Sequence, residues 1–138
     1  MLFGLKDVVF KTALKTLLAV IIALLLAFGI ASLGFPSQMA DICENTGNYS
    51  LAVSYSSLAY AYSGDVEDLG RCAEDSILAK NDKKTVKYCE KLIGHKDFEE
   101  FCAEKSGVII VGGIELNLDY KTFITENLQA AQSRLNKK

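Results

Sequence analysis

An uninterrupted apolar run near the N-terminus constrains this chain more than any other feature. No charged residue occurs between Lys15 and Asp41, and Leu17 to Phe35 reads LLAVIIALLLAFGIASLGF, 19 residues interrupted only by one serine and two glycines. At the helical rise of about 1.5 Å per residue the run extends about 28 Å, close to the roughly 30 Å hydrocarbon core of a bilayer. A small domain has too little surface to bury a helix that is apolar on all sides. We therefore predict a transmembrane helix at residues 16–36.

The ten residues GFPSQMADIC that follow the run decide whether it is an anchor or a cleaved signal. A signal peptide has an apolar region of about 7 to 15 residues and small residues before the cut. This run is longer, and a cut before Asp41 would place Gln38 and Ala40 at the two recognition positions. Pro36 is expected to end or bend the helix at the residue before it. We predict an uncleaved anchor, with a cleaved signal as the alternative.

The basic residues beside the span predict its orientation in the cell membrane. Three lysines lie within residues 1–15, whereas the first basic residue after the span is Arg71. Basic residues are enriched on the cytoplasmic side of a span. We therefore expect a cytoplasmic N-terminal segment at 1–15, a single pass, and an extracytoplasmic domain at 37–138.

The charge of the outer segment excludes one class of partner. Residues 1–35 carry three Lys and one Asp, so the remainder carries 12 basic and 16 acidic side chains, a net charge of −4. A nucleic-acid-binding domain carries a clustered basic surface. We expect no nucleic acid among the partners.

Small residues recur every four positions inside the span. The series is Ala19, Ala23, Ala27 and Ala31. Small residues on one helix face allow two helices to approach closely. The series is a candidate pairing surface for a homodimer, although alanine is also common in spans that do not pair.

The outer segment shows helical periodicity divided by turn residues. Apolar residues step by three and four positions, as on one face of a helix, and turn residues interrupt them at Gly47, Ser63-Gly64-Asp65, Asn81-Asp82, Gly94 and Ser106-Gly107. An amphipathic helix is expected from about Tyr120 to the C-terminus. This pattern predicts an all-α domain of antiparallel helix hairpins with short loops. The apolar face positions are Leu51, Tyr55, Leu58, Tyr62, Val66, Leu69, Ala73, Ile77, Val86, Cys89, Ile93, Phe98, Phe101 and Cys102.

Residues 108–118, VIIVGGIELNL, break the helical pattern. A β-branched run is followed by Gly112-Gly113, which can turn with positive φ, and then by alternating apolar residues. This order predicts a β-hairpin, and an apolar loop packed on the helices is the alternative. The glycines are not followed by the Gly-Lys-Ser/Thr element of a phosphate-binding loop.

One stretch resembles a known repeat family. The segment SSLAYAYSGDVEDLGRCAEDSILAKND is similar to a tetratricopeptide-type hairpin, and a weaker second unit runs from Lys83 to Lys105. The resemblance implies a small right-handed stack of helix hairpins, an α-solenoid fragment whose concave face binds peptides or proteins. An ordinary helical bundle is the alternative. The matching positions are Leu58, Ala59, Ala61, Tyr62, Gly64, Asp65 and Ala73.

Four cysteines, Cys43, Cys72, Cys89 and Cys102, all follow the span. Outside the cell an even number of cysteines predicts disulfides, each stabilising a small domain by about 2 to 4 kcal/mol. The turn at Gly94 is expected to bring Cys89 and Cys102 to similar heights on facing helices, which leaves Cys43 with Cys72. Buried free thiols are the alternative, because the same positions suit small apolar side chains.

The remaining polar residues form no catalytic pattern. His95 lies between two cysteines, but the spacing matches no metal-binding element, and no Cys-x-x-Cys or nucleophile triad can be recognised. We expect no catalysis, no metal and no cofactor. Tyr55, Tyr60 and Tyr62 are candidate contact residues because aromatic side chains are frequent binding anchors, although such residues are more often core.

These observations predict a membrane-anchored protein–protein interaction or scaffold module without catalytic activity. The alternative is a disulfide-stabilised extracytoplasmic domain that binds a small ligand or a metal at the cysteine-bearing hairpin.

Overall fold

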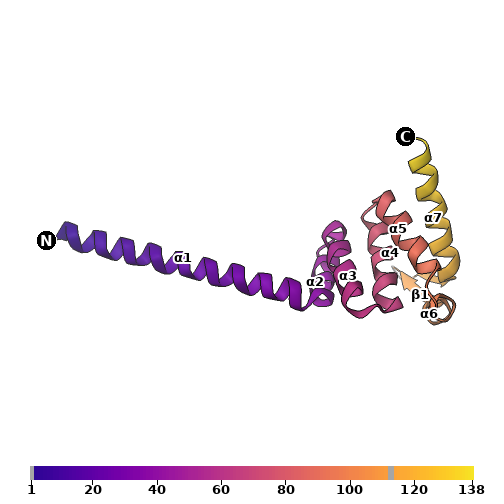
Figure 1. The fold of residues 1–138 in the computed structure, drawn as a ribbon, viewed down its shortest axis with the longest axis horizontal. Coiled ribbons are helices and arrows are strands. Elements are labelled where there is room, and N and C mark those ends of the chain that lie inside the picture. The colour runs from indigo at the N-terminus through magenta and orange to yellow at the C-terminus, as the bar shows by residue number, and fades with distance from the viewer. Residues whose placement is uncertain (1, 112–113) are drawn as a thin grey trace. The chain divides into compact units, whose positions relative to one another are not determined.

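The computed structural model describes residues 2–111 and 114–138, and the chain divides into two compact units, Met1–Phe35 and Pro36–Lys138. The first unit is one helix, α1 (Leu2–Gly34), drawn in indigo to violet in Figure 1. The second unit holds the remaining helices and a two-stranded sheet. Among the described residues the fold is therefore all-α apart from one β-hairpin, as predicted.

α1 is long and apolar enough to cross a membrane. Gly4–Gly34 is 31 residues long, its most apolar window has a mean hydropathy of 2.7, and none of that window is buried. The helix also includes most of the segment predicted to lie in the cytoplasm, where Thr12 Oγ1 donates to the Val8 carbonyl at 2.8 Å. It ends at Gly34, and Pro36 is the first residue of α2, a position where the missing N–H of proline costs nothing.

The second unit is a series of short helices. α2 packs against α3, α3 against α4, α4 against α5, and α5 against α7, while α6 contacts α4 and α7. Helices adjacent in sequence are thus neighbours in space over most of the series, as in Figure 1. The elements are α2 (Pro36–Asn45), α3 (Tyr49–Ser63), α4 (Val66–Leu78), α5 (Asp82–Ile93), α6 (Phe98–Lys105), β1 (Gly107–Val111), β2 (Ile114–Leu118) and α7 (Tyr120–Asn136).

Local caps mark the start of α3, the end of α3 and the start of α5. Asn48 Oδ1 accepts from the N–H of Leu51, and Asn81 Oδ1 accepts from the N–H of Lys84 at 3.1 Å. Gly64 has φ of 69°, a left-handed conformation that glycine adopts without strain, and its N–H donates to the Tyr60 carbonyl at 2.8 Å. The end of α3 is therefore fixed by Gly64, one of the residues that predicted the turn, whereas the Asp65 side chain makes no capping hydrogen bond to α4.

Of the two predicted helix hairpins, the structure contains the first but not the second. α3 and α4 form a packed pair on either side of Gly64, but α6 packs mainly on α4 and α7 rather than lying along α5. The reason is its length: α6 has eight residues, about two turns, and its three buried residues point into the common core. The expected facing arrangement of the α5 and α6 helices is therefore wrong, and the tetratricopeptide likeness stays a prediction.

The core lies around α4 and α5. Small residues on α4 allow close packing there, and Tyr120 and Ile124 of α7 close the core on one side. Each buried aliphatic side chain contributes about 1.5 to 3 kcal/mol to stability by leaving water. The buried cluster is Val53, Leu69, Cys72, Ala73, Tyr88, Cys89, Leu92, Phe98, Phe101, Cys102, Tyr120, Ile124 and Leu128.

The predicted β-hairpin at 108–118 is confirmed. β1 and β2 are antiparallel, with Gly107 opposite Leu118 and Val111 opposite Ile114; the Gly112-Gly113 turn lies outside the described residues. At the base of the hairpin Ser106 Oγ donates to the Cys102 carbonyl at 2.7 Å and accepts from the N–H of Tyr120 at 3.0 Å. This serine joins the end of α6 to the start of α7 and so helps to position Tyr120.

Candidate functional site

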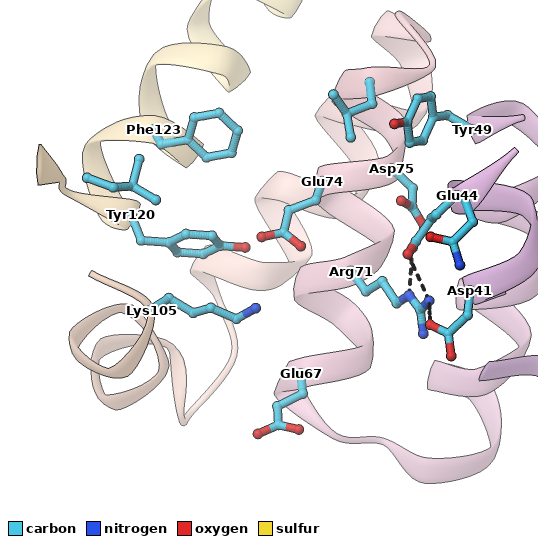
Figure 2. A pocket seen from close by; sticks show the side chains of 13 residues that line it. Asp41, Glu44, Tyr49, Glu67, Arg71, Glu74, Asp75, Lys105, Tyr120 and Phe123 are labelled. Carbon is cyan, nitrogen blue, oxygen red and sulfur yellow. Dashed lines mark hydrogen bonds and ion pairs between the residues drawn. The ribbon is translucent and has the colours of Figure 1, made fainter. Parts of the chain in front are cut away.

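A pocket of about 680 Å³ lies beside α4 in the second unit. Its walls come from α2, α3, α4, α6, β2 and α7, and Figure 2 shows many of these side chains converging from both sides of α4. We call it the α4 pocket. Its lining residues are Asp41, Glu44, Asn45, Tyr49, Glu67, Arg71, Glu74, Asp75, Leu78, Lys105, Leu118, Tyr120 and Phe123.

α4 supplies the floor of the pocket because it is amphipathic with two different faces. Glu67, Arg71, Glu74 and Leu78 follow one another at steps of four, three and four, which places them on one side of the helix. The other side, including Leu69, is packed into the core. One helix therefore holds the polar side chains of the pocket on a rigid support.

Arg71 ties α4 to α2. Its Nε donates to Glu44 Oε1 at 2.6 Å and its Nη2 to Glu44 Oε2 at 2.9 Å, a bidentate pair, and Nη2 also bonds Asp41. Nη1 donates to the Ser37 carbonyl at 3.3 Å. The hydrogen bond that Arg71 donates to Glu44 is the main cause that raises the pKa of Arg71, so the cation is permanent. The dashed lines in Figure 2 mark this pair.

Asp75 is a buried carboxyl, 2% exposed, behind the Arg71 pair. The pKa of Asp75 is raised to about 7, mainly by burial and also by the neighbouring Glu44, against a hydrogen bond from Ser56 Oγ at 2.7 Å that lowers it. The hydrogen bond from Arg71 is the main cause that lowers the pKa of Glu44. The two carboxyls therefore differ in protonation near neutral pH: Glu44 carries the charge and Asp75 retains much of the proton.

Tyr120 and Glu74 face each other at the other end of the pocket. Tyr120 is 1% exposed, and its ring meets the Phe101 ring edge-on at a centroid distance of 5.2 Å. Its hydroxyl oxygen is buried and makes no hydrogen bond of regular geometry to any described residue, although the Glu74 carboxyl lies near enough to interact with it. Figure 2 shows this hydroxyl pointing toward the Glu74 carboxyl. Burial is the main cause that raises the pKa of both groups. The charge of Glu74 and its contact with the hydroxyl raise the pKa of Tyr120 further, whereas the charge of Lys105 and the contact with Tyr120 partly offset the rise for Glu74.

Gly70 permits this close packing against α4. A Cβ at position 70 would lie 2.4 Å from Phe101 Cζ and 3.3 Å from the Tyr120 hydroxyl oxygen. Cβ atoms essentially never come as close as 3.0 Å to another heavy atom. Glycine is thus required for α6 and the start of α7 to reach the helix.

The pocket carries more negative than positive charge. Five carboxyls line it against two cations, Arg71 and Lys105. Arg71 is engaged by Asp41 and Glu44, and Lys105 Nζ lies over the Phe101 ring, 5.6 Å from its centroid. Among the described residues Glu74 has no ion-pair partner within 4 Å, and neither has Glu67. The site is therefore suited to a group that brings positive charge.

The four cysteines are all buried free thiols. The structure thus has neither of the two disulfides that the sequence predicted, Cys89–Cys102 and Cys43–Cys72, and it shows the alternative of buried thiols. Burial raises the pKa of Cys72 and Cys89 to about 12. Because the thiolate is the reactive form, these side chains serve as core residues.

The predicted tyrosine contacts lie outside the pocket. Tyr60 is partly buried against the core and lies under Lys91 Nζ, 5.5 Å from the ring centroid, while Tyr62 is 62% exposed and Tyr55 is half-buried. The aromatic side chains of the pocket are instead Tyr49, Tyr120 and Phe123.

Two other sequence hypotheses can be placed on the structure. Ala19, Ala23, Ala27 and Ala31 lie along α1 as expected, and pairing through them stays a prediction. His95 accepts a hydrogen bond at Nδ1 from the N–H of Asp97 at 3.1 Å in the turn before α6. No group of three or more His, Cys, Asp or Glu among the described residues could hold a metal ion.

Comparison of the chain with protein families, with curated proteins and with solved structures gave no significant match. The class of protein is therefore defined by its own features: an all-α domain with an acidic pocket, preceded by a helix long enough to span a membrane.

Proposed function

We propose that the protein is a membrane-anchored protein–protein interaction or scaffold module without catalytic activity, and that the α4 pocket is its binding surface. The single observation that carries this proposal is the pocket itself: about 680 Å³, with unpaired carboxylates beside apolar and aromatic side chains. Concave sites with apolar walls and a few directed polar groups are typical of binding surfaces.

The placement of the module follows from α1. The helix has the length and apolarity of a membrane span, and the lysines before it favour a cytoplasmic N-terminus. The pocket would then lie outside the cytoplasm, where a protein or peptide partner would meet it. Pairing of two spans through the alanine series would bring two copies of the module together on one membrane.

A tetratricopeptide-like arrangement would suit this role. The packed α3–α4 hairpin and its Gly64 turn support the likeness, since such hairpins present the inner face of one helix to a peptide. The α4 face that bears Glu67 and Arg71 would be that surface. The alternative, ligand or metal binding at the cysteine-bearing hairpin, has no supporting cluster among the described residues.

Site-specific photocrosslinking tests the proposal. A photoreactive p-benzoylphenylalanine is placed at position 67, which is exposed at the pocket, and in a matched variant at position 104, which is exposed on α6 outside it. Both full-length variants are expressed in the native cells and irradiated. We expect a discrete protein adduct from position 67 that position 104 does not give. Identical products from both positions, or none from position 67, would contradict the proposal.

A further inference from the structure

The strongest unexplained feature of the pocket is the orphaned Tyr120 hydroxyl. A buried hydroxyl without a partner loses its hydrogen bonds to water and gains none in return, which is unfavourable and uncommon in folded proteins. Here the side chain is 1% exposed, and its oxygen makes no hydrogen bond of regular geometry to any described residue, although it interacts with the Glu74 carboxyl. The ring is held on both sides, edge-on to Phe101 and 6.0 Å from Phe123, so the hydroxyl has little freedom to turn elsewhere.

The hydroxyl lies beside a carboxyl that also has no ion-pair partner. Figure 2 shows Glu74 and the Tyr120 hydroxyl pointing toward each other across the pocket. Lys105 lies on the same side in Figure 2, and its charge lowers the pKa of Glu74, but its ammonium makes no ion pair with Glu74 within 4 Å and lies over the Phe101 ring. The pocket therefore contains two acceptor groups directed at one place and no cation bound to both.

We infer that the Glu74–Tyr120 end of the α4 pocket binds a lysine or arginine side chain from a protein partner. The N–H groups of the cation would donate to the Glu74 carboxylate and to the Tyr120 hydroxyl oxygen, satisfying both. Charge-assisted hydrogen bonds of this kind are about twice as strong as neutral ones. This inference rests on the proposed function and names the chemistry of its partner.

The walls of the pocket favour a side chain with an apolar stem over a bare ion. Leu78, Leu118 and Phe123 line the same cavity as the two acceptors. Lysine and arginine bury their methylene stems along apolar surface while the charged end remains bonded. Glu67, which is exposed at the pocket, adds a second carboxylate. It could accept hydrogen bonds from the partner's backbone beside the bound side chain or from a neighbouring basic residue of the partner.

The test uses the full-length protein in nanodiscs with ¹³C-labelled tyrosine rings. The probes are the peptide acetyl-Leu-Lys-Leu-amide, its counterpart with neutral norleucine in place of lysine, and n-butylammonium. The resonance of Tyr120, assigned by its loss in Tyr120→Phe, reports binding. We expect a saturable shift with the lysine peptide, and affinities at least about tenfold lower for the norleucine peptide and for butylammonium.

Two variants separate the site from general charge effects. Glu74→Gln should weaken binding of the lysine peptide at least about tenfold. Binding to this variant is followed through whichever tyrosine resonances shift. Glu104→Gln, which removes an exposed carboxylate outside the pocket, should leave the affinity for the lysine peptide unchanged. Glu74→Gln should also fold normally, because it removes a half-buried charge that has no ion pair. Tyr120→Phe should weaken binding about fivefold while the midpoint of thermal unfolding without peptide stays the same or rises.

Three results would overturn the inference: no response of Tyr120 to the lysine peptide, equal binding of the lysine and norleucine peptides, or butylammonium binding as tightly as the peptide. The last result would indicate a free amine rather than a protein side chain as the ligand. A partner crosslinked from position 67 despite any of these results would leave the proposed function standing and remove only this ligand chemistry.

Discussion

Replacement of Gly70 by alanine measures how closely the pocket wall packs on α4. The new Cβ would lie 2.4 Å from Phe101 Cζ and 2.7 Å from Cε1, about 1 Å inside ordinary carbon–carbon contact distance. The Phe101 ring is only 3% exposed and is held by Tyr120, so it cannot swing into solvent.

Two effects oppose each other in this substitution. Alanine within a helix is favoured over glycine by about 1 kcal/mol, whereas overpacking a core costs about 1 to 3 kcal/mol, and more where backbone must move. Because α6 and the start of α7 must both shift, we take the upper part of that range. The expected net loss is about 1 to 2 kcal/mol of unfolding free energy, or roughly 4 to 16 °C in the melting temperature of a domain of this size.

Thermal unfolding followed by circular dichroism of the full-length protein in detergent checks this expectation. The matched control is Gly94→Ala, where the new Cβ would meet backbone oxygens at the ordinary contact distances of 3.5 and 3.8 Å; this substitution should change stability by less than about 0.5 kcal/mol. In the double variant Gly70→Ala/Phe101→Leu, the smaller leucine side chain should make room for the new Cβ and recover part of the lost unfolding free energy. If Gly70→Ala is as stable as the wild type or more so, α6 and Tyr120 do not pack on α4 as described.

Other substitutions and reagents test the buried polar groups of the domain. The folded-state pKa of Asp75 is raised, so the contribution of Asp75 to stability is complete below its unfolded pKa near 3.8 and is lost as the pH rises toward 7. Across that pH range the wild type should lose on the order of 2 to 4 kcal/mol of unfolding free energy relative to Asp75→Asn. Denaturant unfolding at a series of pH values measures this difference. Arg71→Met leaves Glu44 and Asp41 without their cation and should destabilise the protein by about 1 to 3 kcal/mol in urea unfolding, whereas an unchanged midpoint would show that the pair contributes little. Cys72 and Cys89 should react with a maleimide only after denaturant is added, and labelling of either thiol in the folded protein would contradict their burial.

The parts of the fold that were predictable from the sequence are those governed by neighbours along the chain. The apolar run specifies α1 by composition alone, Gly64 ends α3 by its left-handed conformation, and alternation around residues 108–118 specifies the hairpin. The orientation of α6 was not predictable in the same way. Its eight residues carry too short a pattern to show which neighbours it packs against, and so the pairing of Cys89 with Cys102 was inferred from an arrangement that the structure does not have.

The α4 pocket depends on contacts between residues far apart in sequence. Arg71 meets Glu44 across 27 positions, and Tyr120 belongs to a helix that begins 50 residues after Gly70. A signal was present on α4, because Glu67, Arg71, Glu74 and Leu78 repeat at helical spacing opposite the core face. A polar stripe of this kind usually faces solvent, so only the packing of α2 and α7 beside it distinguishes a pocket from an ordinary exposed surface.

Occupation of the α4 pocket in the membrane can be measured by the labelling rate of a single cysteine at the pocket. Since all four native thiols are buried, Glu67→Cys would provide an accessible thiol at the pocket, and Glu104→Cys would provide one outside it. Both variants are labelled with maleimide in broken native membranes and after purification in detergent. We expect Glu67→Cys to react at least about tenfold more slowly in membranes than when purified, while Glu104→Cys reacts equally in both. Equal rates for Glu67→Cys in the two preparations would contradict a bound partner at the pocket.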